Sequence, residues 1–193
     1  MKAIAIVGSP RVGGNSQVLA ETCLAVIADQ GIEIECIHLA GMSVAGCTDC
    51  DVCKTEETCS IDDDLIPIYE KMVEAQAIIL SAPTYFGSAP PEIKAVMDRA
   101  GFIAHRHGNR FARKIGSPIS VSRRAGHNFT FAQLLQWFYI NEIIVPGSSY
   151  WSIAIGRDPG EVRQDAEGIH TVEDLGRNIA WLTQLVWGSS DES

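Results

Sequence analysis

Short apolar segments alternate with longer segments of helical periodicity along the whole chain, and this alternation restricts the fold more than any other feature. We expect strands at residues 2–7, 32–39, 77–82 and 118–122, with a last strand region at 143–145 and 150–155. We expect helices at residues 15–31, 62–74, 91–100 and 129–141, and a C-terminal helix at about 171–187. Such alternation through short connections predicts an α/β fold with a parallel sheet covered on both faces.

Composition places the chain among ordinary globular proteins. Its 193 residues, 46% hydrophobic and 20% charged, suffice for one core, and no repeat or interdomain linker is visible, so residues 1–193 are expected to form a single domain. The sequence shows no secretory signal and no apolar run long enough to cross a bilayer, which predicts a soluble, cytoplasmic protein. A net charge of −9 disfavours binding to nucleic acid or to anionic membranes.

Several polar residues are predicted to end or brace helices. Asn15 and Ser16 can cap the free N–H groups of the first helix, and Thr171 with Asp174 resembles a capping box. The pair Asp98-Arg99 is expected to form an ion pair or a cap. The C-terminal helix is predicted to bury a stripe made of Val172, Leu175, Ile179, Leu182 and Val186.

The loop after the first strand, residues 8–17, has the composition of an anion-binding site. Ligands of parallel sheets bind beyond the carboxyl ends of the strands, where this loop lies. Its glycines allow close approach of the backbone, Ser9, Asn15 and Ser16 can donate hydrogen bonds, and Arg11 adds charge. We therefore expect a phosphate monoester here, although a ligand-free turn with a capped helix would use the same residue types.

A tightly held NAD is disfavoured by two features. The motif G-x-G-x-x-G is absent, and the second strand ends in His38-Leu39, where an NAD site usually places an acid for the ribose.

Four cysteines in one run, Cys47-x2-Cys50-x2-Cys53-x5-Cys59, are the most specific feature of the sequence. Three thiols at two-residue intervals can surround one cuboidal cluster, and the fourth completes the ligation of a [4Fe–4S] centre. A structural zinc site is the main alternative, although such sites usually join two separated Cys-x-x-Cys pairs. A loop that has lost its cluster, or that forms disulfides on oxidation, is a further alternative.

Two other cysteines, Cys23 and Cys36, stand apart from this run on apolar faces. We expect both to be small buried hydrophobic residues without a chemical role.

The residues Gly8-Ser9-Pro10-Arg11 with Gly14-Asn15-Ser16 resemble the signature of the NADPH-dependent FMN reductase and iron–sulfur flavoprotein families. The cysteine run, Tyr150-Trp151 and the long C-terminal helix resemble the iron–sulfur flavoproteins of anaerobic archaea and bacteria. The resemblance covers nearly the whole chain. It implies FMN as cofactor and a flavodoxin-like, doubly wound sheet of five parallel strands in the order 2-1-3-4-5.

Two more loops resemble flavin-binding loops of this family. Residues 81–88 resemble the loop that supports the isoalloxazine ring and the ribityl chain, and residues 122–127 resemble a loop that passes along the flavin. From the residues alone, Tyr85 and Phe86 could also be core aromatics, and residues 122–127 a solvated basic turn. The resemblance implies a cofactor site made of Ser9, Arg11, Asn15, Ser16, Gln17, Pro83, Thr84, Tyr85, Phe86, Gly87, Ser122, Arg123, Arg124, Ala125 and Gly126.

The resemblance implies a flavin-dependent oxidoreductase that transfers electrons between a [4Fe–4S] cluster on the four cysteines and FMN. A ferredoxin-like donor and a small oxidant are the implied partners, and no acid–base side chain is required. One alternative is an NAD(P)H-dependent FMN or quinone reductase with a peripheral or zinc-bound cysteine loop. Another is a non-catalytic electron carrier or a zinc-stapled interaction protein. Four acids are expected to keep the cluster potential low, namely Asp49, Asp51, Glu56 and Glu57.

A basic segment, residues 105–114, departs from the acidic trend of the chain. It could meet a nucleotide phosphate or an acidic ferredoxin, or it could be a solvated loop. The resemblance also implies a homodimer or homotetramer. The candidate interface aromatics are Trp137, Trp151, Trp181 and Trp187, and partly buried core positions would explain these four tryptophans as well.

Overall fold

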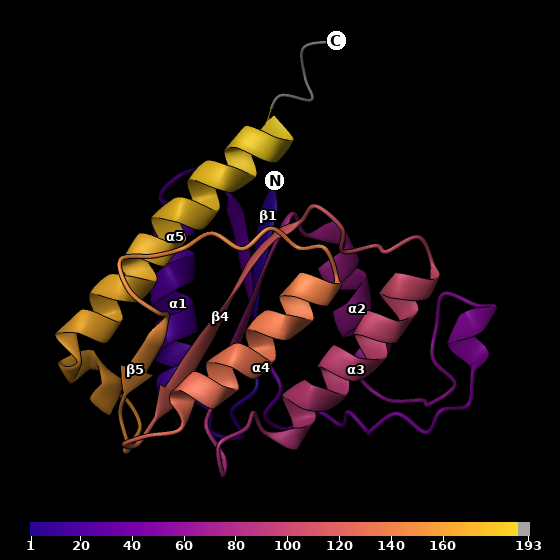
Figure 1. Ribbon diagram of the computed structural model, residues 1–193, viewed down its shortest axis with the longest axis horizontal. Helices are drawn as coiled ribbons and strands as arrows, with labels where there is room; N and C mark the ends of the chain where they lie inside the picture. The colour runs from indigo at the N-terminus through magenta and orange to yellow at the C-terminus, as the bar shows by residue number, and fades with distance from the viewer. Residues whose placement is uncertain (189–193) are drawn as a thin grey trace.

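The computed structural model describes residues 1–188, and within them five parallel strands form one sheet in the order β2-β1-β3-β4-β5 (Figure 1). This confirms the flavodoxin-like strand order. The strands are β1 Lys2–Val7, β2 Glu33–His38, β3 Ala77–Pro83, β4 Ile115–Ser122 and β5 Ile153–Ile155. The helices are α1 Asn15–Ala28, α2 Leu65–Glu74, α3 Pro91–Arg106, α4 His127–Ile140 and α5 Ala166–Trp187, with the 3-10 turns η1 Val52–Lys54 and η2 Glu161–Gln164.

Helices α1 and α5 cover one face of the sheet, and α2, α3 and α4 cover the other (Figure 1). Successive side chains of a strand point to opposite faces. In β3, Ile78 and Leu80 accordingly join the core beneath α2–α4, whereas Ala77 and Ile79 join the core beneath α1 and α5. Burial on both faces explains why the central strands read as continuous apolar runs.

Helix α3 runs to Arg106, although we expected it to end at residue 100. Gly101, the first residue beyond the expected end, lies inside the helix, where the indole of Trp137 on α4 packs against it. A Cβ at this position would lie 3.0 Å from Trp137 Nε1. The glycine therefore permits close helix packing, and the helix carries His105 and Arg106 in its last turn.

The last strand is shorter than expected. β5 pairs with β4 over three residues, whereas Ile144 forms only an isolated bridge with Ile115. Pro146 and Gly147 follow this bridge, and proline has no N–H group with which to continue a ladder.

Two predicted caps are wrong. Gly14 is the N-cap of α1, without a side-chain cap, and the Asn15 Oδ1 atom instead accepts a hydrogen bond from the Val162 N–H group at 3.3 Å. Helix α5 begins before Thr171 because the Asp165 side chain caps it, accepting from the Gly168 N–H group at 3.0 Å.

The predicted stripe of α5 is buried at its first three positions, Val172, Leu175 and Ile179. Val186 is 38% exposed. Val186 is exposed because the C-terminal end of α5 extends beyond α1 (Figure 1).

Two further expectations are corrected. Cys23 is fully buried, but Cys36 is exposed because it lies on β2, an edge strand of the sheet.

Asp98 and Arg99 do not pair with each other. Asp98 binds Lys94 at 2.6 Å, and Arg99 binds Asp63 at 2.5 Å.

The four tryptophans are not equivalent. Trp137 is a core residue whose indole N–H group donates to the Met97 carbonyl at 2.7 Å, which agrees with the buried-core alternative for this tryptophan. Trp151 and Trp181 are more than half exposed.

No helix within residues 1–188 has both the length and the apolar character that a membrane crossing requires.

Candidate functional site

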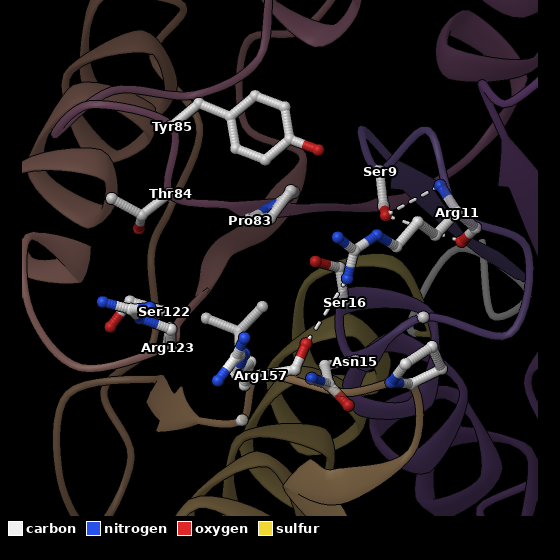
Figure 2. Close-up of a pocket in the computed structure, with 14 residues that line it drawn as sticks. Ser9, Arg11, Asn15, Ser16, Pro83, Thr84, Tyr85, Ser122, Arg123 and Arg157 are labelled. Carbon is white, nitrogen blue, oxygen red and sulfur yellow. Dashed lines mark hydrogen bonds between the residues drawn. The ribbon is translucent and has the colours of Figure 1, made fainter.

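A cavity of about 240 Å³ opens at the carboxyl ends of the strands (Figure 2). We call it the carboxyl-edge cavity. Nine residues of the predicted cofactor site line it, namely Ser9, Arg11, Asn15, Ser16, Pro83, Thr84, Tyr85, Ser122 and Arg123. The structure brings them together because β1, β3 and β4 are parallel neighbours, so that the loops after them meet at one edge.

The loop between β1 and α1 is folded around its own polar groups. The Ser9 hydroxyl accepts from the Arg11 N–H group at 3.2 Å, and the Gly14 N–H group donates to the Arg11 carbonyl at 3.2 Å. A Cβ at Gly14 would lie 3.0 Å from that carbonyl, so a larger residue would disturb the turn. The N-terminus of α1 and the Arg11 side chain both border the cavity, which favours an anion there.

The hydroxyl of Ser16 is the most informative group of this loop. Ser16 is 1% exposed, and its Oγ atom has no hydrogen-bond partner among the described residues. A buried hydroxyl without a partner costs free energy, so an unpaired one that borders a cavity indicates a ligand atom.

The opposite side of the cavity is formed by the end of β3 (Figure 2). The Thr84 N–H group donates to the Val121 carbonyl at 2.9 Å, which joins this loop to β4. Tyr85 and Ser88 exchange backbone hydrogen bonds of 2.8 and 3.1 Å across a tight turn, in which Phe86 and Gly87 have positive φ. This turn places Tyr85 in the cavity wall and leaves Phe86 fully exposed at its tip.

Six residues of the predicted site do not line the cavity, namely Gln17, Phe86, Gly87, Arg124, Ala125 and Gly126. Gln17 supports the loop between β1 and α1, because its side-chain carbonyl accepts from the Gly13 N–H group at 2.8 Å. Gly126 is the N-cap of α4, where a φ of 89° favours glycine.

A histidine that the sequence did not nominate orients the cavity residue Ser122. The Ser122 hydroxyl and His127 Nδ1 are 2.8 Å apart. Burial lowers the pKa of His127, although Asp165 opposes this shift, so the imidazole is neutral at pH 7. A neutral imidazole can hold the hydroxyl without placing a charge beside the cavity.

Sequence reasoning also missed the loop after β5. Gly156, Arg157 and Pro159 line the cavity, and the Arg11 guanidinium donates to the Arg157 carbonyl at 3.4 Å. The rule that located the other loops, which is that ligand residues follow strands, would have found this loop as well.

A second, narrow cavity of about 30 Å³ lies between the cysteine run and α3. We call it the cysteine cavity. Cys47, Cys50, Cys53 and Cys59 all line it, so the structure brings the four predicted ligands to one place. Among residues 1–188, no three or more histidine, cysteine, aspartate or glutamate side chains are grouped so that they could hold a metal ion. The thiols thus share a cavity without converging on one point.

Each of the four thiols has a hydrogen-bond partner. Cys50 Sγ lies 2.9 Å from the Ser60 hydroxyl, and this contact lowers the pKa of Cys50. Cys47 Sγ accepts from the Asp49 N–H group at 3.4 Å. The other two thiols, Cys53 and Cys59, accept from arginine side chains.

Arg99 joins α3 to the cysteine run. Its buried guanidinium donates to Cys59 Sγ at 3.0 Å and to both carboxylate oxygens of Asp63, at 2.5 and 3.1 Å. Burial opposes the ionisation of Asp63, but the hydrogen bonds from Arg99 and two backbone N–H groups outweigh it and lower the pKa of this carboxyl group.

The basic segment 105–114 is not a solvated loop. Arg106 donates to Cys53 Sγ at 3.0 Å, His107 Nε2 lies 3.1 Å from the Cys53 carbonyl, and Arg110 binds Glu57 at 2.9 Å. Lys114 is buried and donates to the Val73 and Ala75 carbonyls. Arg106 and Arg110 therefore contact the cysteine run at the surface of the molecule, and of the charged side chains of this segment Lys114 is the buried one.

Comparison with known proteins agrees with this architecture. The family model of NADPH-dependent FMN reductases matches residues 1–158. An iron–sulfur flavoprotein of Methanocaldococcus jannaschii is 37% identical over 193 residues, which cover 96% of this chain and 99% of that protein. An iron–sulfur flavoprotein of Methanosarcina thermophila is 32% identical over the full length of both chains. A solved archaeal flavodoxin superposes with a TM-score of 0.64 at 17% identity, covering 95% of this chain and 99% of the flavodoxin.

Proposed function

Because this chain belongs to the NADPH-dependent FMN reductase family and, within it, to the iron–sulfur flavoproteins, we propose that it transfers electrons between a [4Fe–4S] cluster and FMN. The observation that carries this proposal is that all four cysteines of the run line a single cavity in a flavodoxin-like chain. A ferredoxin-like donor, with NAD(P)H as the alternative donor, and a small oxidant as acceptor complete the proposal.

The residues of the carboxyl-edge cavity fit FMN. The Ser16 hydroxyl, the Arg11 side chain and the α1 N-terminus would hold the phosphate, since all three border the cavity and suit an anion. Pro83, Thr84 and Tyr85 would form a wall for the flavin ring, which has an apolar body and polar edges.

The donor set of the cysteine cavity fits an iron–sulfur cluster. Four thiols are present, and Ile61, Phe102 and Ile103 supply an apolar lining that limits water. The narrow cavity must widen to admit a cluster. Cys47 and Cys50 are exposed, so their side chains can turn without disturbing packed structure. When bound, the cluster would supply single electrons and FMN would combine them into pairs for an acceptor.

The first experiment is purification without oxygen, followed by a visible spectrum and by analysis of flavin, iron and acid-labile sulfide. We expect FMN and about four irons per chain. Cys50→Ala should lose the iron and keep the FMN, whereas Cys36→Ala, which changes an exposed cysteine outside the cavity, should keep both.

Native protein that contains flavin without iron, or flavin with zinc, would contradict the proposal. The alternative would then be a reductase in which hydride passes directly from NADPH to FMN. Rapid bleaching of the flavin by NADPH in a stopped-flow experiment would support that alternative.

A further inference from the structure

We propose that Arg106 and Arg99 are positioning residues that raise the reduction potential of the cluster, because their guanidinium groups donate hydrogen bonds to the sulfur atoms of Cys53 and Cys59. This inference rests on the proposed function, since it requires a cluster on the four cysteines.

One face of α3 is directed at the cysteine run. Phe102 and Ile103 lie three and four residues after Arg99, and Arg106 lies four and three residues after them, so all four share one face, and all four line the cysteine cavity. The two arginines lie two turns apart on this face, and each reaches a different thiol. The helix therefore determines which thiols receive a charged donor.

Both guanidinium groups are held in place by other contacts. Arg99 is 2% exposed and is bound to Asp63 and to the Ala45 carbonyl, the latter at 3.0 Å. The Arg106 guanidinium lies over the Phe102 ring, 5.3 Å from its centre, and contacts Asp51 at 3.5 Å. Donors fixed in this way need not reorganise when an electron arrives.

The four thiols are not equivalent as a result. Cys53 and Cys59 accept from cationic donors, whereas Cys47 accepts from a backbone N–H group and Cys50 shares a hydrogen bond with the Ser60 hydroxyl. A positive donor on a ligand sulfur stabilises the added negative charge of the reduced cluster, which raises the reduction potential.

The same contacts change the expected influence of the acidic residues. Asp51 pairs with Lys54 at 2.6 Å and with Arg106, and Glu57 pairs with Arg110. These carboxylates are therefore partly neutralised, and the arginines on sulfur act against the negative field of the loop.

The test compares Arg106→Gln with Arg110→Gln. Both variants remove one positive charge next to the loop, but only Arg106 contacts a sulfur atom. The midpoint potentials of the cluster and of FMN would be measured by redox titration with EPR detection, together with iron and sulfide per chain. We expect a more negative cluster potential in Arg106→Gln, native iron content, native FMN potentials, and no change of potential in Arg110→Gln.

A native cluster potential in Arg106→Gln at full iron content would overturn the inference, and so would equal shifts in the two variants. If Arg106→Gln binds less iron, the potential is measured on the clusters that remain, because EPR detects only those. A native potential of the remaining clusters would overturn the inference, and a more negative one would support it.

Arg99 is tested by Arg99→Lys, which keeps a cation for the buried Asp63 carboxylate. We expect a more negative cluster potential in this variant as well. An unchanged potential at full iron content would show that Arg99 does not influence the reduction potential of the cluster. A different result would contradict the proposed function itself, namely native protein that contains no iron and no acid-labile sulfide.

Discussion

At the residue scale, the unpaired hydroxyl of Ser16 makes a direct prediction. Ser16→Ala removes a group that has no hydrogen bond within the described chain, so apoprotein stability should change by less than about 0.5 kcal/mol. If the hydroxyl donates to the FMN phosphate, the Kd for FMN should rise about tenfold, which corresponds to about 1.4 kcal/mol for one charge-assisted hydrogen bond. Fluorescence titration of the apoprotein with FMN measures the Kd.

Thr183→Ala is the matched control, because Thr183 Oγ1 is likewise buried without a partner but does not line the carboxyl-edge cavity. FMN affinity should be native in this variant. An unchanged FMN affinity in Ser16→Ala would show that this hydroxyl does not contact the ligand.

Lys114 predicts a dependence of stability on pH. Burial, with a smaller contribution from Arg110, lowers the pKa of Lys114 from 10.5 to about 8. Between these values the unfolded chain binds the proton and the folded chain does not, so the free energy of unfolding contributed by this residue rises with pH, by up to about 3 kcal/mol.

The measurement is urea unfolding of the native protein and of Lys114→Met at several pH values from 7.5 to 10.5. The difference between the two proteins isolates Lys114 from other groups that titrate in this range. We expect the native protein to gain stability relative to the variant as the pH rises. A constant difference would contradict the assignment.

At the element scale, the packing of α5 on α1 depends on Gly176. A Cβ at this position would lie 2.7 Å from the Cys23 carbonyl oxygen and 3.0 Å from Val26 Cβ. Alanine favours a helix over glycine by about 1 kcal/mol, but a backbone clash between two helices costs about 1–3 kcal/mol. We expect Gly176→Ala to destabilise the protein, as measured by thermal or urea unfolding.

Leu185→Ala on the same helix is the control, because Leu185 is 60% exposed and should change stability by less than about 0.5 kcal/mol. A Gly176→Ala variant that is more stable than the native protein would show that helix propensity outweighs the contact with α1.

At the scale of the whole molecule, the two cavities are independent in construction. They share no lining residue. The cysteine run is also attached to the fold by contacts that involve no cysteine, including Arg99 with Asp63 and Tyr69 with Glu57 at 2.8 Å. We therefore predict that removal of iron by a chelator under anaerobic conditions leaves FMN bound.

Flavin fluorescence after gel filtration reports the bound FMN, and far-UV circular dichroism reports the secondary structure. Both should match those of the iron-loaded protein. Release of FMN in proportion to the iron removed would show that the cysteine cavity supports the carboxyl-edge cavity.

The alternation of strands and helices follows from local periodicity in the sequence. Four of the nine predicted cavity residues, Ser9, Arg11, Asn15 and Ser16, follow from the composition of the loop after the first strand, whereas the strand order and the other five residues came from the family resemblance. The shared cavity of the four cysteines also follows from their close spacing.

The groups that surround those cysteines depend on packing between elements that are distant in the sequence. Arg99 reaches Cys59 and Asp63 from a separate helix, and Arg106 reaches Cys53 across 53 positions of the sequence. The helix expected to end at residue 100 continues to Arg106, and Cys36, expected to be buried, is exposed on the edge strand β2. Local patterns do not record such contacts, because the packing of distant elements decides the burial and partner of each side chain.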